Sequence, residues 1–261
     1  MIVSMGRGTS SIIRSDLDQA VEVFSRGFAF GRSFAYPAEA RLVQGIWVIR
    51  DQKRERAKDY RLEEWTAVNL APAKVDSVAR KNTRGRFCIC AVRSMDTSKD
   101  ALRDGYRALG YRLGTTEAFM IHRLKSIAKC PQVFSTQRVM SQKLADAVAK
   151  AARSRQILTE DLRTDAPMRL YAAMDGKNPI GWARGVVVGN ATWVSSVFVL
   201  PAYRRRGIGK SMMGKMLRDD RALGIQRSIL LASRAGQMLY NSMGYETIGE
   251  LLIYTTPRKK T

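Results

Sequence analysis

The sequence predicts a mixed α/β fold arranged as two tandem domains, and two observations lead to this expectation. The first is a change of hydrophobic period along the C-terminal half, where alternating segments typical of strands give way to helical ones. The second is an internal repeat that places a strand–helix–strand unit at the end of each half. We therefore expect each half to be a mostly antiparallel sheet flanked by helices.

The C-terminal half carries the clearer pattern. Expected strands cover residues 133–139, 168–174, 180–188, 192–200, 227–231 and 246–254, and expected helices cover 141–153 and 208–223, with a short helix before the last strand. Turn-forming clusters at 175–178 and 189–190 separate three of the strands. Because such short connections join antiparallel neighbours, this half is expected to begin as a meander and to end as a strand–helix–strand unit.

The N-terminal half is organised in a similar way. Expected helices cover residues 16–28, 72–80 and 101–110, and expected strands cover 46–49, 60–68, 87–92 and 112–124. A polar stretch at 125–131 follows the last of these strands and ends in Pro. We place the domain boundary there, which gives domains of residues 1–128 and 129–261.

The internal repeat aligns residues 101–111 with residues 235–245. Three positions are identical, in the order Tyr, Gly, Tyr: Tyr106, Gly110 and Tyr111 in the first copy, and Tyr240, Gly244 and Tyr245 in the second. An apolar strand precedes each copy and an extended segment follows it. The Gly suits the left-handed residue that closes many helices, so the repeat predicts a helix that ends at the same place in both halves.

The charge of the chain leaves two interpretations open. The formal net charge is +22 and the isoelectric point is near 10.5. One interpretation is an anionic partner such as nucleic acid, a ribosome or a phosphorylated substrate. The other is a basic solvated surface that reflects an Arg-rich composition. The second is favoured because the basic residues are spread along the chain, and no stretch combines them with stacking aromatics.

Composition also sets expectations about the compartment. The three cysteines, Cys88, Cys90 and Cys130, are too few for a disulfide framework, so a reducing cytoplasm is expected. No apolar run reaches membrane-spanning length, and residues 1–11 lack the apolar core of a secretory signal. Neither a membrane partner nor a metal is expected, because one histidine and three cysteines are a poor ligand set.

The most informative segment is the run from Val199 to Ser211. A strand ends at Leu200, Pro201 follows, and the Gly-spaced turn Arg-Arg-Arg-Gly-Ile-Gly opens a helix. Glycines let the backbone approach a ligand, and several N–H groups then converge on one anion. The first helical turn adds unpaired donors, so this pattern predicts an anion site.

This segment resembles the acyl-CoA-binding motif of the GNAT N-acetyltransferases. The shared features are R-x-x-G-x-G after a strand, the V-x-P-x-Y-R lead-in and, downstream, L-Y-x-x-x-G-Y at 239–245. A Walker loop would need its first Gly at a longer spacing. The resemblance covers about residues 168–254 and implies that the chain binds acetyl-CoA.

The resemblance also implies roles for individual residues. Backbone amides of Phe198 and Val199 would bind the pantetheine arm, and Tyr240 would protonate the leaving thiolate of CoA. The pyrophosphate would lie in the turn formed by Arg204, Arg205, Arg206, Gly207, Ile208, Gly209 and Lys210. A tyrosine with an ordinary pKa of about 10 is protonated at neutral pH and suits an acid.

The general base is left open by the sequence. Many members of the family have a carboxylate on the strand before the turn, where this chain has Ser195 and Ser196. Attack by a neutral amine, a water relay and a carboxylate from the other half all remain candidates. A covalent acyl-enzyme is not expected, because His122 lies in the other half and is interpreted as structural. Cys88 and Cys90 are interpreted as buried hydrophobes.

The N-terminal half is interpreted as a degenerate GNAT-like domain. Residues 69–75 occupy the place of the phosphate turn but contain no glycine and no basic cluster. Tandem members of the family show this arrangement. The half is expected to cover a sheet edge and to shape the acceptor groove. Trp47, Tyr60 and Trp65 are candidates for the groove or, equally, for the core.

Together these features predict an acetyl-CoA-dependent N-acetyltransferase that transfers acetyl to a primary amine by direct attack. The identity of the amine carries no motif that can be interpreted. Two alternatives remain: a non-catalytic acyl-CoA-binding regulatory module, indicated by the missing strand carboxylate, and a basic protein associated with nucleic acid or the ribosome, which is compatible with the charge but is not favoured.

Overall fold

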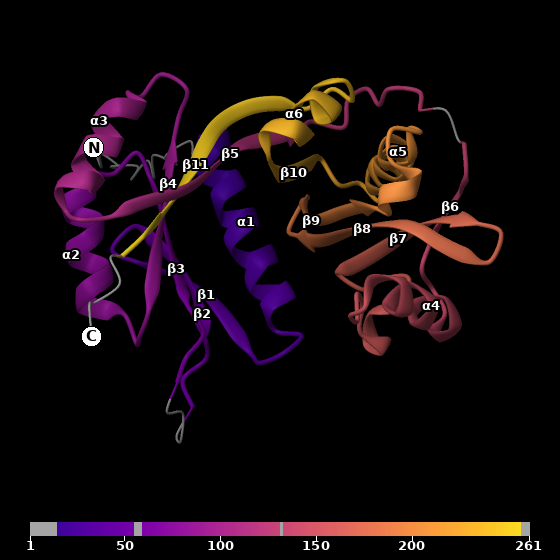
Figure 1. Ribbon diagram of the computed structural model, residues 1–261, viewed down its shortest axis with the longest axis horizontal. Coiled ribbons are helices and arrows are strands. Elements are labelled where there is room, and N and C mark those ends of the chain that lie inside the picture. Colours follow the sequence, from indigo (N-terminus) through magenta and orange to yellow (C-terminus); the bar gives the residue numbers. More distant parts are fainter. Residues whose placement is uncertain (1–14, 55–58, 131–132, 257–261) are drawn as a thin grey trace, which may run out of the picture.

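The computed structural model describes residues 15–54, 59–130 and 133–256, which form one continuous sheet of eleven strands with helices on both faces (Figure 1). The strand order is β1-β2-β3-β4-β11-β5-β10-β9-β8-β7-β6. The expectations for residues 1–11 and for Pro131 lie outside the described residues.

The N-terminal half contains three helices and five strands among the described residues. In chain order they are α1 (Asp16–Arg32), β1 (Ala38–Val43), β2 (Ile46–Asp51), β3 (Glu63–Val68), α2 (Pro72–Asn82), β4 (Phe87–Arg93), α3 (Lys99–Ala108) and β5 (Arg112–His122). The sequence reading missed β1. It pairs with β2 through a tight turn at Gln44 and Gly45, whose φ angles of 50° and 83° match the twist of a hairpin.

The C-terminal half follows the expected order of elements. These are β6 (Ser135–Arg138), α4 (Gln142–Ala152), η1 (Thr159–Asp161), β7 (Met168–Asp175), β8 (Asn178–Val188), β9 (Ala191–Val199), η2 (Pro201–Tyr203), α5 (Ile208–Ala222), β10 (Arg227–Ala232), α6 (Arg234–Asn241) and β11 (Glu246–Thr255). Strands β6 to β9 form the antiparallel meander, and β10 joins β9 in parallel. The mixed sheet expected from the sequence is confirmed.

The internal repeat is also a structural repeat. In both copies the second Tyr donates its backbone N–H to the carbonyl of the first, at 3.0 Å in the N-terminal half and 3.1 Å in the C-terminal half. The two glycines have φ angles of 81° and 92°, in the left-handed region that only Gly adopts easily. The paired rings meet edge to face in each copy, with centroids 5.7 Å and 5.6 Å apart.

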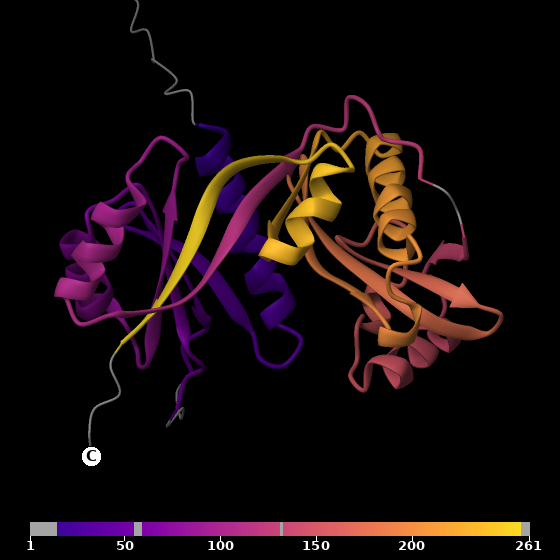
Figure 2. The same ribbon diagram turned by 45° about the horizontal axis from the view of Figure 1, so that its top comes forward.

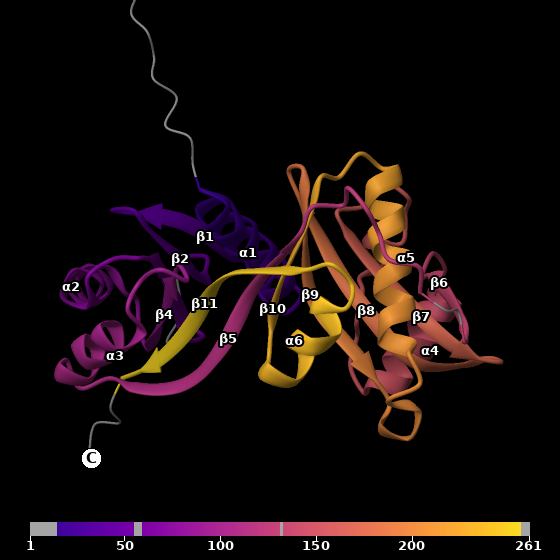
Figure 3. The same cartoon turned by 90° about the horizontal axis from the view of Figure 1, so that it is seen from above.

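The two halves exchange their last strands, which the sequence did not predict. β11 lies between β4 and β5, and β5 lies between β11 and β10. β5 and β11 run side by side through the middle of the molecule and join the two halves (Figure 2, Figure 3). Both neighbours of β11 therefore belong to the N-terminal half, so each half supplies backbone hydrogen bonds that complete the other.

Helix α1 lies against strands of both halves on one face of the sheet, which we call the α1 face. Its buried side chains Phe24 and Val21 share a cluster with Trp47 of β2, Phe119 of β5 and Trp193 of β9. Helix α4 packs on the same face, since Phe30 and Phe34 of the α1 region contact its cluster. Helices α2 and α3 cover the opposite face of the N-terminal half, and α5 and α6 that of the C-terminal half.

Because of the strand exchange, a fragment of residues 129–261 is expected not to unfold cooperatively when expressed alone. In this fragment β11 loses both of its neighbouring strands, and β10 loses β5. Unpaired strand edges leave backbone groups without partners and promote aggregation. Thermal unfolding followed by circular dichroism tests this, with coexpressed 1–128 and 129–261 as the control that restores a folded complex. A sharp transition in the isolated fragment would contradict the expectation.

Candidate functional site

A cleft opens where β9 and β10 separate. The two strands pair only as far as Val194 and Leu230, and β9 then continues to Val199 without a partner on that side. The separation begins at Ser195, an extra residue in the register between β8 and β9. Such a bulge bends a strand and increases its twist. The resulting cleft has a volume of about 660 Å³ and is lined by residues of β5, β9, β10, α6 and the turn before α5.

The predicted turn closes one end of this cleft. Gly207 has a φ of 76° and is the N-cap of α5, where it provides no side-chain cap. The first N–H groups of α5 therefore lack intrahelical partners and are free for an anion. Arg205 also has a left-handed φ, of 62°. This curvature between an extended strand and a helix makes a concave backbone of the kind that suits an anion.

The structure brings the predicted binding residues to the cleft. Phe198, Val199, Arg204 and Gly209 line it, and Arg205, Arg206, Gly207, Ile208 and Lys210 complete the same turn. The Ile208 side chain is buried in the α5 cluster and anchors the turn to the core. None of the four cations of the turn forms an ion pair with a carboxylate of residues 15–54, 59–130 or 133–256. Their charges are therefore available to an anionic ligand.

Two side-chain contacts hold Arg204 at the cleft. Its Nε donates to the carbonyl of Val199 at 3.1 Å, and its guanidinium lies 5.7 Å from the ring centroid of Phe198. The Phe198 ring itself stacks on Trp182 of β8 at 4.7 Å. The strand end and the turn are thus fixed to each other before any ligand binds.

Tyr240 lines the cleft from α6. Its ring rests edge-on against Tyr245, and burial raises the pKa of its hydroxyl above the ordinary value. The hydroxyl has no hydrogen-bond partner within the described part of the chain. A partly buried, protonated and unpaired tyrosine at this place can donate a proton to a group in the cleft.

Glu117 is a cleft residue that the sequence reading did not single out. It lies on β5, one residue before the position that pairs with Ala232 at the end of β10, and it lines the cleft. Burial alone raises the pKa of its carboxyl group above the usual value, and no cation of the described residues pairs with it. It comes from the N-terminal half through strand exchange, so no local motif could have indicated it.

The remaining candidates fall outside the cleft or have no acid–base role. Ser195 and Ser196 line the cleft, where their hydroxyls are poor bases. His122 is buried, and its Nδ1 accepts the backbone N–H of Leu124 at 3.0 Å, in agreement with a structural role. Trp47 and Trp65 are buried in the core clusters and do not line the cleft. Cys88 and Cys90 are buried free thiols, as expected.

At the corresponding place of the N-terminal half the strands stay together. β3 and β4 remain paired over all of β3, up to Val68 and Val92. Pro72 at the start of α2 lies so close to Gly105 of α3 that a Cβ on that glycine would approach the proline Cγ to 2.8 Å. Helices α2 and α3 thus meet where α5 and α6 leave the cleft open.

Two features are absent from residues 15–54, 59–130 and 133–256. These residues contain no cluster of three or more His, Cys, Asp or Glu side chains suited to a metal ion. No helix within them is both long and apolar enough to cross a membrane.

Comparison with known proteins identifies the domain and fold that the chain resembles. Residues 166–247 match the family model of the acetyltransferase (GNAT) domain. A GCN5-related N-acetyltransferase from Kribbella flavida has a similar structure, with a TM-score of 0.61 and 15% identity over 92% of this chain and 96% of that one. A GCN5-related N-acetyltransferase-like protein from Streptococcus suis has a TM-score of 0.54 and 10% identity over 92% of this chain and 99% of that one.

A tandem GNAT protein from the clavulanic acid biosynthesis pathway gives a TM-score of 0.50 and 12% identity over 83% of this chain and 80% of that one. No curated protein matches the sequence significantly. At these identities the structural likeness establishes the fold. The chain therefore contains a GNAT acetyltransferase domain in its C-terminal half and has, over most of its length, the fold of GCN5-related N-acetyltransferases, tandem members included.

Proposed function

We propose that this protein is an acetyl-CoA-dependent N-acetyltransferase that acetylates a primary amine. The observation that carries the proposal is the cleft between β9 and β10, which has an anion-binding turn at one end and places Tyr240 and Glu117 along its walls. A non-catalytic acyl-CoA-binding protein would need the turn but would have no use for an unpaired carboxylate in the same cleft.

Donor binding would use backbone more than side chains. The edge of β9 that faces the cleft has peptide groups at Phe198 and Val199 that pair with no strand on that side. The pantetheine arm would hydrogen-bond to them as a neighbouring strand would. The first turn of α5 and the cations from Arg204 to Lys210 would hold the pyrophosphate. Bound in this way, acetyl-CoA supplies a thioester whose carbonyl carbon accepts the amine.

The chemistry assigned to the chain consists of two proton transfers. Glu117 removes a proton from the amine nitrogen as the nitrogen bonds to the acetyl carbon. Tyr240 donates its hydroxyl proton to the sulfur as the carbon–sulfur bond breaks. The products are an N-acetyl amide and free CoA, and no electrons are exchanged with another reactant. A raised carboxyl pKa suits the base because it brings the pKa closer to neutral pH.

We further propose that the N-terminal half, residues 1–128, binds no donor. The paired strands β3 and β4 and the close approach of Pro72 to Gly105 support this, since they leave a cavity of only about 230 Å³ at the place that the cleft occupies in residues 129–261. Its function would be to supply β5, with Glu117, and α1. The free cysteines are consistent with work in a reducing cytoplasm.

Tyr240→Phe tests the proposal. The change is expected to lower kcat by about 10²-fold or more, because the thiolate loses its proton donor. The variant should still bind acetyl-CoA with a stoichiometry near one per chain, measured by isothermal titration. Activity is read as thiol release with a panel of amines. Tyr106→Phe at the repeat-equivalent position is the matched control and should not change kcat. An unchanged kcat in Tyr240→Phe, or absence of acetyl-CoA binding by the folded protein, would refute the proposal.

A further inference from the structure

Arg184 is a charged side chain next to the cleft that the proposed chemistry does not use. It lies on β8, and its Nε donates to Oγ of Ser195, the bulge residue, at 3.1 Å. Its Nη1 reaches the carbonyl of Gln156 in the segment after α4 at 3.5 Å. The ring of Phe34, in the turn after α1, covers one face of the guanidinium at 5.7 Å. Three separate segments therefore enclose this one cation.

The charge of Arg184 is not neutralised by the protein. No carboxylate within residues 15–54, 59–130 and 133–256 pairs with it, and its Nη2 has no acceptor among those residues. Burial lowers the pKa of the guanidinium, with no acid nearby to offset the effect. Arg184 is half-buried, and a charge that is partly withdrawn from water without a paired carboxylate loses part of its hydration without compensation. A partner from outside the chain would remove this deficit.

Arg184 and Glu117 belong to the same side of the sheet. Arg184 pairs with Leu170, whose side chain packs in the α4 cluster of the α1 face. Glu117 is two residues before Phe119 in β5, so both side chains lie on the same face, and Phe119 packs against α1 there. Ser195, which Arg184 contacts, lines the cleft. Glu117 lies on β5 and Arg184 on β8, with β10 and β9 between them, so an acceptor that contacts both spans the separated ends of β10 and β9 on this face.

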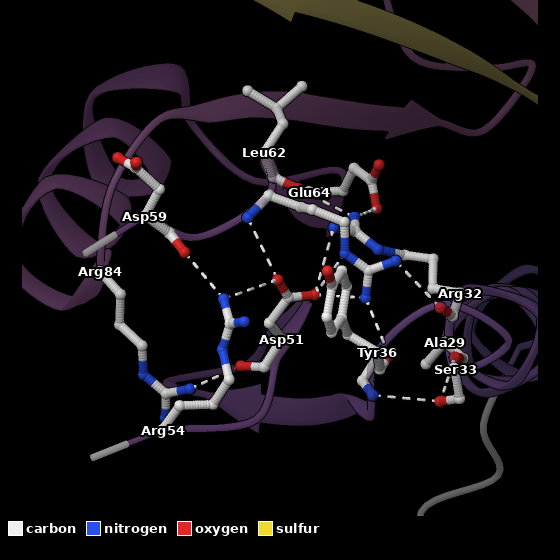
Figure 4. A network of polar contacts seen from close by, with 12 residues as sticks. Ala29, Arg32, Ser33, Tyr36, Asp51, Arg54, Asp59, Leu62, Glu64 and Arg84 are labelled. Carbon is white, nitrogen blue, oxygen red and sulfur yellow. Dashed lines mark hydrogen bonds and ion pairs between the residues drawn. The ribbon is translucent and has the colours of Figure 1, made fainter. Parts of the chain in front are cut away.

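A polar network around Asp51 lies at the end of α1 and includes Arg32 and Tyr36, which flank Phe34 in the sequence (Figure 4). Arg61 donates to the carbonyls of Arg32 and Tyr36, at 2.9 Å each, and so fixes both ends of the turn that carries Phe34. Asp51 holds Arg61 by accepting its backbone N–H at 3.1 Å and its Nε at 2.7 Å. The turn that places the Phe34 ring over Arg184 is therefore fixed by hydrogen bonds within the chain. The edge of the guanidinium that carries Nη2 remains open to a ligand.

We infer that Arg184 binds a carboxylate of the acceptor, so that the substrates are amines that also carry a carboxylate, such as amino acids. The inference rests on the proposed function, since it concerns the acceptor of the same cleft. A planar guanidinium with its Nη2 free matches the geometry of a carboxylate, and the ring of Phe34 excludes water from one of its faces. The net charge of +22 would also favour anionic acceptors during encounter.

The test compares each amino acid with its own carboxamide, using glycine, β-alanine, L-lysine and L-phenylalanine, together with the carboxylate-free amines tyramine and spermidine. For the amino acids that the wild type acetylates, kcat/KM should exceed that of the matching carboxamide by about 10-fold or more. This is the effect expected from one hydrogen bond to a charged group. Arg184→Gln should bring that ratio close to one, because kcat/KM falls for the amino acid and stays the same for its carboxamide. Arg184→Lys should keep part of the preference. Arg107→Gln, on the exposed surface of α3, removes the same charge and should change nothing.

Five results would overturn the inference. Carboxamides acetylated as well as the amino acids, or a preference that survives in Arg184→Gln, would show that Arg184 does not read a carboxylate. A weaker affinity of Arg184→Gln for acetyl-CoA would place Arg184 on the donor side. Acetylation of tyramine or spermidine alone would overturn the inference and leave the proposed function standing, whereas no acetylation of any amine would refute both. Unchanged thermal unfolding of Arg184→Lys shows that the site is intact.

Discussion

Replacing Glu117 with Gln is expected to lower kcat by about 10²- to 10⁴-fold, the range that a positioned general base contributes. Glu117 is the carboxylate that lines the cleft, and the amide of Gln cannot accept the amine proton. The change keeps the size of the side chain, so acetyl-CoA should bind as in the wild type. Steady-state thiol release at saturating acetyl-CoA measures the loss.

The pH profile gives an independent check on this role. Burial raises the pKa of Glu117, so its carboxylate is lost by protonation at a higher pH than for an exposed glutamate. The rate should therefore fall as the pH falls through this raised pKa, which gives the pH profile an acidic limb. Glu117→Gln should lack this acidic limb. Glu117→Asp should restore part of the activity and the limb. The exposed Glu160→Gln serves as the control for the loss of a negative charge.

Near-normal activity of Glu117→Gln with an unchanged acidic limb would assign the base elsewhere. Attack by an amine that has already lost its proton in solution would then be the remaining route. In that case the rate should follow the fraction of neutral amine, and it should shift with the pKa of the chosen acceptor. The two mechanisms are thus separated by using acceptors of different amine pKa.

The parts of the site that could be predicted from the sequence are those made by local chain geometry. The turn from Arg204 to Lys210 and the position of Tyr240 each depend on residues a few places apart, where glycines and a helix start carry a recognisable pattern. The Tyr-Gly-Tyr repeat was informative for the same reason, because a left-handed Gly must follow each helix.

Glu117 and Arg184 could not be predicted because their roles arise from distant pairing. Glu117 enters the cleft only because β5 leaves its own half and pairs with β10. Arg184 is exceptional through what surrounds it, namely Phe34 of the other half and a carbonyl after α4. In the sequence each is one charged residue within a strand. An alternative pairing of β5 would have given the same local pattern and a different site.

Asp220→Ala is expected to destabilise the protein by about 3–5 kcal/mol, the loss found when one partner of a buried ion pair is removed. Asp220 of α5 and Arg169 of β7 are 0% and 2% exposed, with Oδ1 and Nη2 2.9 Å apart. The same Nη2 donates to Thr192 Oγ1 at 3.2 Å, and neither oxygen of Asp220 has a well-aligned donor. Without Asp220, the charge of Arg169 would remain buried and unpaired. Chemical denaturation of the variant measures the loss.

The matched control is the double variant Arg169→Met/Asp220→Leu, which removes both charges and should lose far less stability than the single one. A second signature is the pH dependence. Burial raises the pKa of Asp220 to about 6 in spite of Arg169, so the native state binds a proton that the unfolded chain has released. Between pH of about 4 and about 6 the stability of the wild type relative to Asp220→Asn should therefore fall as the pH rises. A relative stability that rises over this interval would show that the ion pair, and not burial, controls Asp220.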